Sequence, residues 1–303
     1  MSKSAMDKSL VWPILQKIEQ ASSEEELNKI LAPHIIKAYR ENAGLVEEAN
    51  EIEEAMAQRR IILSGNSTMQ TEDWLKKFVT QDKEMILMKS KIRKLSRVDD
   101  PVLIQGETGT GKELLARALH GNRKGKVIAL NCAGMPEHLI ESELFGHVRG
   151  AFTDAKDAKV GLMKAATDGT LFLDEIGELK ITLQAKLLRA IQEKRIRRVG
   201  SNDDESINCR FIAATHHDLK KLVSENNFRK DLYYRLAIFK VQTKPLRERV
   251  EDITLIIDSL TTDEKKRLPA KGLEKFHFDG NVRDLQSMIR RYTVLDELPD
   301  IPE

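Results

Sequence analysis

The stretch GETGTGK, residues Gly106 to Lys112, constrains this chain more than any other part of it. It follows the apolar run PVLIQ and precedes the helical pattern ELLARALHG, which is the strand–loop–helix setting that a G-x-x-x-x-G-K loop requires. Glycines let backbone N–H groups converge on phosphate oxygens, and the start of the next helix adds partial positive charge. The alternative, a coincidental Gly-rich turn, does not explain this context. The motif therefore predicts a phosphate site in which Lys112 reaches the outer phosphates.

One residue departs from the general motif. Glu113 follows the lysine, where a Ser or Thr hydroxyl normally touches magnesium, so the metal must depend on another carboxylate. The residues predicted to contact the nucleotide in this segment are Gly106, Glu107, Thr108, Gly109, Thr110, Gly111, Lys112 and Glu113.

The second carboxylate site stands at the end of another apolar run, GTLFLDE. The carboxyl end of a strand beside the phosphate loop is where Asp174 can hold Mg²⁺ and Glu175 can polarise an attacking water. Adjacent acids at a strand end are common by themselves, but together with the upstream loop they predict hydrolysis of a nucleoside triphosphate rather than binding alone. The predicted cofactors are ATP and Mg²⁺.

The pattern along the chain predicts an α/β fold. The runs PVLIQ, KVIALN, GTLFLDE and CRFIAAT are nearly continuous in apolar residues and indicate buried strands. Helical patterns separate them, so we expect a parallel sheet covered on both faces. We expect this α/β ATPase domain over residues 76–245, a helical C-terminal subdomain over 246–303 and a helical N-terminal segment over 1–75.

The N-terminal segment is acidic. Residues 1–75 hold eight Lys or Arg against thirteen Asp or Glu, which argues against a DNA clamp there, whereas the formal charge of the whole chain, +2, argues neither way. The apolar stripe Leu45, Ala49, Ile52 and Met56 fits either a helix lying on its own domain or a short coiled-coil dimer seam. No apolar run is long enough for a membrane span, and the N-terminus is no signal peptide, so we expect a cytoplasmic protein.

Six segments in order resemble the AAA+ domain of sigma-54-dependent transcription activators: GETGTGKE, LNCAGMPEHLIESELFGHVRGAFTDA, GTLFLDEIGEL, QAKLLRAIQEKRIRRVG, FRKDLYYRL and GNVRDL. The match covers about Lys83 to Leu295, and Glu113 is this family's usual residue after the lysine. The resemblance implies an AAA+ P-loop domain of three α/β/α layers with a C-terminal helical lid. It also implies a ring of subunits, expected to be a hexamer.

The resemblance assigns further roles. Asn131 resembles the family's switch residue, which hydrogen-bonds the catalytic Glu175, and His216 with Thr215 takes the first sensor position near the γ-phosphate. Further along the chain, Arg229 and Arg235 match the arginines presented to a neighbouring subunit's nucleotide, and Arg283 matches the second sensor on the lid. A metal site shared by His216 and His217 is disfavoured, because adjacent residues on a strand point to opposite faces.

The segment GAFTDA resembles the GAFTGA loop with which these activators bind the sigma-54 subunit of RNA polymerase. Phe152 and Thr153 are the expected contact pair, and Asp154 replaces the family's glycine and adds negative charge. The expected partner-binding residues are Gly150, Ala151, Phe152, Thr153, Asp154 and Ala155.

Two other departures shape the functional expectation. The lid motif is FDGNVRDL, and no receiver domain or DNA-binding helix-turn-helix is evident around the AAA+ motifs. We therefore expect a reduced sigma-54 activator. One alternative is an AAA+ remodeller of another protein, in which Asp154 would indicate the different partner. The other alternative is a regulatory module that binds nucleotide without hydrolysis. The intact Lys112, Asp174 and Glu175 argue against the last.

Overall fold

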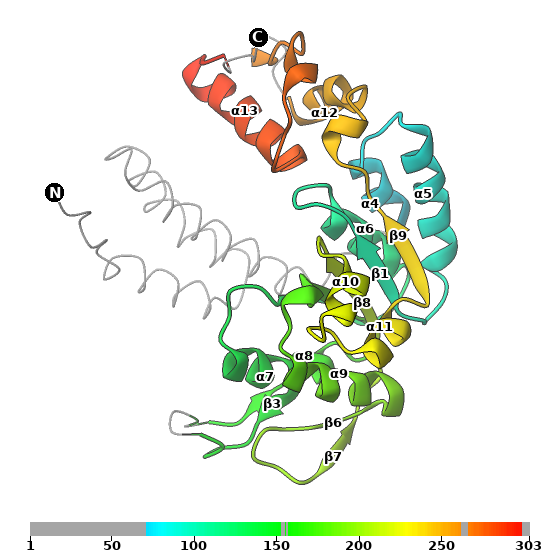
Figure 1. Cartoon of the computed structure of the whole chain (residues 1–303), viewed down its shortest axis with the longest axis vertical. Helices are drawn as coiled ribbons and strands as arrows, with labels where there is room; N and C mark the ends of the chain where they lie inside the picture. The colour runs from blue at the N-terminus through cyan, green and yellow to red at the C-terminus, as the bar shows by residue number, and fades with distance from the viewer. Residues whose placement is uncertain (1–70, 153–154, 156, 262–265, 299–303) are drawn as a thin grey trace, which may run out of the picture. The chain divides into compact units, whose positions relative to one another are not determined.

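The structure, a computed structural model, describes residues 71–152, 155, 157–261 and 266–298. Its centre is a five-stranded sheet in the order β2-β5-β8-β1-β9 (Figure 1). Strand pairs β1–β8, β1–β9 and β5–β8 are parallel. The five strands are β1 (Val102–Gln105), β2 (Val127–Asn131), β5 (Thr170–Asp174), β8 (Arg210–Thr215) and β9 (Phe239–Gln242).

Strand β2 is parallel to its neighbour as well. Thr170 N donates to Lys126 O where β2 and β5 begin, and Cys132 N donates to Asp174 O where they end. All five strands therefore end at the same edge of the sheet. The side chains of β8 are buried along its whole length, as expected for a central strand covered on both faces.

Helices cover both faces of this sheet. The connection from β1 to β2 crosses the sheet in one direction, and the later connections cross it in the other. Because such crossovers are right-handed, α6 lies on one face of the sheet, and α7, α9 and α11 lie on the other. Helices α4 and α5 pack against α6, and α11 packs against α9 and β8. The helices of this domain are α4 (Thr71–Lys77), α5 (Lys83–Leu95), α6 (Lys112–His120), α7 (Glu137–Phe145), α8 (Leu162–Ala165), α9 (Ile181–Glu193), α10 (Leu219–Ser224) and α11 (Lys230–Leu236), with the 3₁₀ turn η1 (Ile176–Glu178).

Two short antiparallel hairpins extend from the sheet and its helices. One pairs β3 (Gly146–His147) with β4 (Lys159–Val160), and the other pairs β6 (Arg195–Arg197) with β7 (Asp204–Ser206). Val148 N donates to Val199 O at 3.1 Å, so the two hairpins lie side by side, as Figure 1 shows at its lower end. The segment that resembles the partner-binding loop is the tip of the first hairpin.

The C-terminal part has its own apolar core. Its elements are η2 (Leu246–Glu248), α12 (Asp252–Leu260), η4 (Leu273–Lys275) and α13 (Val282–Leu295). The buried residues of this core are Leu246, Ile253, Ile256, Ile257, Leu268, Leu273, Phe278, Leu285 and Ile289. This cluster makes the C-terminal lid a subdomain with a core of its own.

The four predicted strands and the parallel sheet covered on both faces are confirmed. The sequence reasoning missed the edge strand β9 and both hairpins. The helical interpretation of residues 1–70, including the stripe from Leu45 to Met56, lies outside the described residues. Among the described residues, no helix is both long and apolar enough to cross a membrane.

Candidate functional site

The loop between β1 and α6 is open toward the end of the strands. Gly111 precedes α6 with φ 98°, and no side chain caps the helix start, so its first N–H groups are available to an anion. Gly109 has φ 75°, and a Cβ there would lie 2.0 Å from Gly280 O. Only glycine fits this position, where the loop contacts the lid backbone.

Three of the predicted site residues, Lys112, Asp174 and Glu175, lie together beside this loop. Lys112 is nearly buried, and its Nζ donates to Gly106 O at 2.9 Å and Glu107 O at 3.2 Å, and lies 3.4 Å from Glu175 Oε1. Asp174 ends β5, and its Oδ1 accepts from Glu175 N at 3.0 Å. The ammonium and both carboxylates therefore lie at the edge where phosphates would approach the loop.

Glu175 has an unusual backbone. Its φ and ψ are both 49°, a left-handed conformation that is uncommon outside glycine and concentrated at functional sites. The chain turns here from β5 into η1. The turn brings the Glu175 carboxylate within hydrogen-bond range of the residue that follows β8, where Oε2 accepts from His216 N at 3.1 Å and lies 2.7 Å from His216 Nδ1.

The pKa values of the two carboxylates are shifted in opposite directions. Burial raises the pKa of Asp174 above its usual value and the Glu175 charge adds to this, although Lys112 opposes both. Burial also disfavours the charge of Glu175, but Lys112 and the hydrogen bonds from His216 outweigh it, so the pKa of Glu175 is lowered. A half-buried carboxylate with a raised pKa is stabilised in its ionised form by a nearby cation, so Asp174 fits a divalent metal ligand.

Asn131 and the histidine pair differ from expectation in detail. The Asn131 side chain accepts from Ala133 N at 2.9 Å, and no hydrogen bond joins it to Glu175 in the part of the chain that the structure describes. The premise that His216 and His217 alternate on a strand is wrong, because both follow the end of β8 and their rings stack 3.9 Å apart. No metal-binding cluster of His, Cys, Asp or Glu occurs among the described residues.

The lid binds the phosphate loop directly. Arg247 makes two hydrogen bonds to the Glu107 carboxylate, and the buried Asn281 donates to Glu107 Oε2 at 3.2 Å and to Thr108 O at 2.9 Å. Asn281 Oδ1 in turn accepts from Leu246 N at 2.7 Å. Sequence reasoning missed Arg247 and Asn281, although the position of Asn281 in the GNVR motif was an available signal.

Arg283 projects from the first turn of α13, one residue after a second contact with the loop. Val282 N donates to Gly109 O at 3.1 Å, which fixes the start of the helix on the loop. The Arg283 side chain is exposed. Its position next to this contact fits the second-sensor role that the resemblance implies.

The two arginines predicted to act on a neighbouring subunit lie at the two ends of α11. Arg229 precedes the helix and binds Asp231 at 2.8 Å, whereas Arg235 is exposed and has no ion pair with any residue that the structure describes. Neither arginine contacts the phosphate loop among the described residues. An exposed arginine that has no ion pair with the described part of the chain can bind another molecule.

The hairpin tip has a defined base. Gly150 N donates to Ala155 O at 2.8 Å, which closes the loop, and Ala155 is buried. The Phe152 side chain is 39% exposed and its ring meets His147 edge-on, with centroids 5.0 Å apart. Thr153 and Asp154 lie outside the described residues, so the expected contact pair is described only at Phe152.

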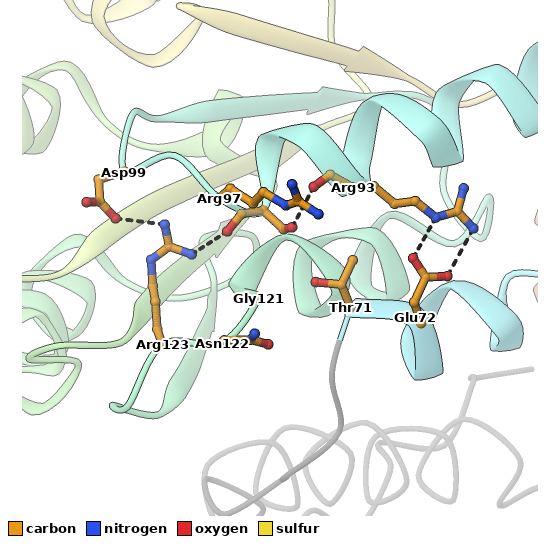
Figure 2. A pocket seen from close by; sticks show the side chains of 9 residues that line it. Thr71, Glu72, Arg93, Arg97, Asp99, Gly121, Asn122 and Arg123 are labelled. Carbon is orange, nitrogen blue, oxygen red and sulfur yellow. Dashed lines mark hydrogen bonds and ion pairs between the residues drawn. The ribbon is translucent and has the colours of Figure 1, made fainter.

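A charged hollow of about 420 Å³ lies at the opposite end of the strands, before β1 begins (Figure 2). Figure 2 shows two of its arginines engaged: Arg93 binds Glu72 through two nitrogens, and Arg123 binds Asp99 and the carbonyl of Ser96. Arg123 satisfies carbonyls at the ends of α5 and α6, and the other contacts are ion pairs between side chains, so the hollow serves the fold rather than the chemistry.

Comparison with known families agrees with this geometry. The chain matches the sigma-54 interaction domain over residues 78–242. It is 38% identical over 281 residues to the formate hydrogenlyase transcriptional activator of Salmonella typhimurium, covering 86% of this chain and 40% of that protein. It is 43% identical over 250 residues to the transcriptional regulatory protein GlrR of Escherichia coli, covering 77% of this chain and 55% of that protein. The chain thus spans about half the length of these relatives.

A solved structure has the same fold. The NtrX protein of Brucella abortus in complex with ATP aligns with a TM-score of 0.65 and 26% identity, over 84% of this chain and 61% of that chain. The likeness extends to Hsp104 bound to ATPγS, at 17% identity and a TM-score of 0.53, which concerns the fold alone. The AAA+ P-loop fold with three α/β/α layers, predicted above, is therefore confirmed.

Proposed function

The chain belongs to the sigma-54 interaction domain family, and on that premise we propose that it is a sigma-54-dependent transcription activator that hydrolyses Mg-ATP. The observation that carries the proposal is the meeting of Lys112, Asp174 and Glu175 beside the open start of α6. An ammonium, a half-buried acid and an ionised carboxylate are the groups that phosphate binding, metal binding and activation of water need.

Each residue has a role in this chemistry. The loop Gly106–Glu113 holds the phosphates, with Lys112 on their outer oxygens and the N–H groups of α6 on the others. Asp174 would hold Mg²⁺, which supplies neutralisation of phosphate charge when bound. Glu175 polarises the attacking water, and Asn131 and His216 respond to the nucleotide state of the site. From the lid, Arg283 reaches the phosphates.

Activity requires a ring of subunits, with a hexamer expected from the family. Arg229 and Arg235 act on the nucleotide of the neighbouring subunit. The exposure of Arg235, which has no ion pair with the described residues, supports this. An arginine that neutralises charge in the transition state accelerates phosphoryl transfer by about 10³–10⁵. Hydrolysis therefore depends on assembly.

The hairpin tip Gly150–Ala155 binds the sigma-54 subunit of RNA polymerase and transmits the ATP cycle to it. Partial exposure of Phe152 supports this role, because its ring offers apolar contact area to a partner. The α/β domain over 76–245 supplies ATPase activity and this contact, and the lid over 246–303 responds to the nucleotide. The segment over 1–75 receives the regulatory signal or contributes to assembly.

A second candidate function is remodelling of another protein by the same ATPase. The replacement of the family's glycine by Asp154 favours it, because the acid changes the charge of the tip. The two functions share all ATPase residues and differ only in the partner.

A trapping experiment tests the proposal. The chain is mixed with purified sigma-54 and ADP with aluminium fluoride, which mimics the transition state of hydrolysis. A stable complex that forms only with the analogue supports the sigma-54 function. Efficient trapping of nucleotide without capture of sigma-54 would favour the second candidate, and absence of nucleotide binding would contradict both.

A further inference from the structure

The Glu175 carboxylate is fully engaged in the described state. One oxygen, Oε1, lies 3.4 Å from Lys112 Nζ, and the other, Oε2, binds both the backbone N and the Nδ1 of His216, at 3.1 and 2.7 Å. An ionised carboxylate only accepts hydrogen bonds, so Nδ1 carries the proton and donates it. A carboxylate that accepts three such contacts is a weak acceptor for a proton from water, so the general base is withheld.

His216 stands where it can exchange this carboxylate for another anion. It follows β8, which lies in the sheet between β5, the strand that leads to Glu175, and β1, the strand that leads to the phosphate loop. Its side chain is 41% exposed, whereas that of Glu175 is 12% exposed. The imidazole therefore keeps an open side while it binds the buried acid.

The neighbouring histidine packs its ring against the imidazole of His216. The ring of His217 stacks on that of His216 with centroids 3.9 Å apart, and His217 Nε2 lies 2.6 Å from Glu178 Oε1. His217 N also donates to Thr215 Oγ1 at 3.0 Å. These contacts fix the backbone at the end of β8, so a change of partner at His216 needs only a movement of its side chain.

We propose that His216 binds Glu175 in the nucleotide-free site and transfers its hydrogen bond to the γ-phosphate when ATP arrives, which releases Glu175 to act as the base. This inference rests on the proposed ATP hydrolysis. The phosphates also draw Lys112 away from Oε1, so one event removes both side-chain partners of the acid and leaves it only the hydrogen bond from His216 N. ADP has no γ-phosphate and leaves Glu175 bound to His216. Asn131, whose side chain is bound to Ala133 N, does not hold Glu175 in this state.

A binding cycle tests this coupling without using activity. Affinities for a non-hydrolysable imido analogue of ATP and for ADP, each with Mg²⁺, are measured for the wild type, E175Q, H216A and the double variant. The neutral amide that E175Q introduces binds the imidazole less strongly than a carboxylate and repels the γ-phosphate less, so E175Q tightens binding of the analogue. The gain in affinity from E175Q is expected to be about five- to tenfold larger when His216 is present than in the H216A background.

Binding of ADP should show no such coupling. The effect of E175Q on the affinity for ADP should differ by no more than about twofold between the wild-type and H216A backgrounds. The control is H138A, which removes an exposed histidine of α7 and should leave the effect of E175Q at its wild-type size. Equal tightening by E175Q with and without His216 would overturn the proposal. Failure of the wild type to bind the analogue would instead contradict the proposed ATPase function.

A spectroscopic measurement gives a second test on the wild type. The Nδ1–H signal of His216 in ¹⁵N-resolved NMR is identified by its loss in H216A. It should shift when the ATP analogue binds and remain in place with ADP. A signal that stays in place although the analogue is bound would show that His216 keeps its contact with Glu175, against the proposal.

Discussion

Arg247 on the lid binds Glu107 on the phosphate loop through both ends of its guanidinium group. Nη1 lies 2.7 Å from Oε2 and Nη2 lies 2.5 Å from Oε1, across 140 residues of sequence. These hydrogen bonds lower the pKa of Glu107 to about 2, and Asn281 adds to the effect. The pair connects the loop that binds phosphates to the subdomain that carries Arg283.

We predict that R247Q weakens nucleotide binding more than hydrolysis, because the lid loses the contact that holds Arg283 over the loop. The KM for ATP should rise about three- to tenfold with a smaller change in kcat. R247K should be intermediate, since an ammonium cannot bind both oxygens in this geometry. Steady-state kinetics of R247Q, E107Q and the double variant check this. Additive effects of the two changes would show that the residues act independently.

The ion pair also has a defined pH range. Because the folded pKa of Glu107 lies below its unfolded value, the stability it contributes is present above about pH 4.5 and is lost as the pH falls through about 2. The pair is therefore intact throughout the neutral range. High salt, rather than moderate acid, should weaken it.

Lys112 and Glu175 should separate binding from hydrolysis. K112A removes a charge from the phosphates and should weaken nucleotide binding. E175Q should retain binding and lose about 10²–10⁴ in kcat, because an amide is a poor base. Equilibrium binding together with ATPase rates distinguishes the two effects. A wild-type rate in E175Q would show that another group activates the water.

The arginines of α11 should act between subunits. ATPase activity per subunit should rise with protein concentration. A mixture of inactive R235A and inactive K112A chains should recover part of the activity, because a mixed interface combines an intact loop with an intact Arg235. The measurement is the ATPase rate across mixing ratios. A constant specific activity down to a demonstrably monomeric sample would contradict the proposed role.

His120 should make the fold sensitive to mild acid. It is buried at the end of α6 with Nδ1 2.9 Å from Thr170 Oγ1, and burial, aided by the Arg123 charge, lowers its pKa to about 4. The unfolded chain therefore binds a proton more readily between about pH 6.5 and 4, so stability falls as the pH falls through this range.

The expected loss is on the order of 2–3 kcal/mol of the free energy of unfolding. Urea unfolding at pH 7 and pH 4.5 measures it. H120N should reduce this pH dependence, whereas H138N, at an exposed site, should leave it as in the wild type. An unchanged pH dependence in H120N would assign the acid sensitivity to other groups.

Much of the fold follows from contiguous patterns. The phosphate loop and the four predicted strands were predictable because their signals lie within one short segment each. The edge strand β9 was not, since FKVQ alternates and has only one fully buried residue, Val241. The hairpin strands β3 and β4 have two residues each, and pairing rather than propensity forms them.

The site shows the same limit. Asp174 and Glu175 were predictable from their place at a strand end. The contact of Arg247 with Glu107 was not, because no local pattern connects residues so far apart. The hydrogen bond from His216 to Glu175 was missed for a different reason, because it depends on the left-handed backbone of Glu175.

The central claim is that ATP hydrolysis in this chain acts on the sigma-54 polymerase through the hairpin tip. The most direct test is transcription from a sigma-54 promoter with purified holoenzyme, ATP and either the wild type or F152A. We predict ATP-dependent transcripts with the wild type. We predict none with F152A, although this variant should keep its ATPase rate and assembly, because Phe152 is partly exposed rather than part of the core. Transcripts at wild-type level with F152A, or none with the wild type at full ATPase activity, would contradict this role of the hairpin tip.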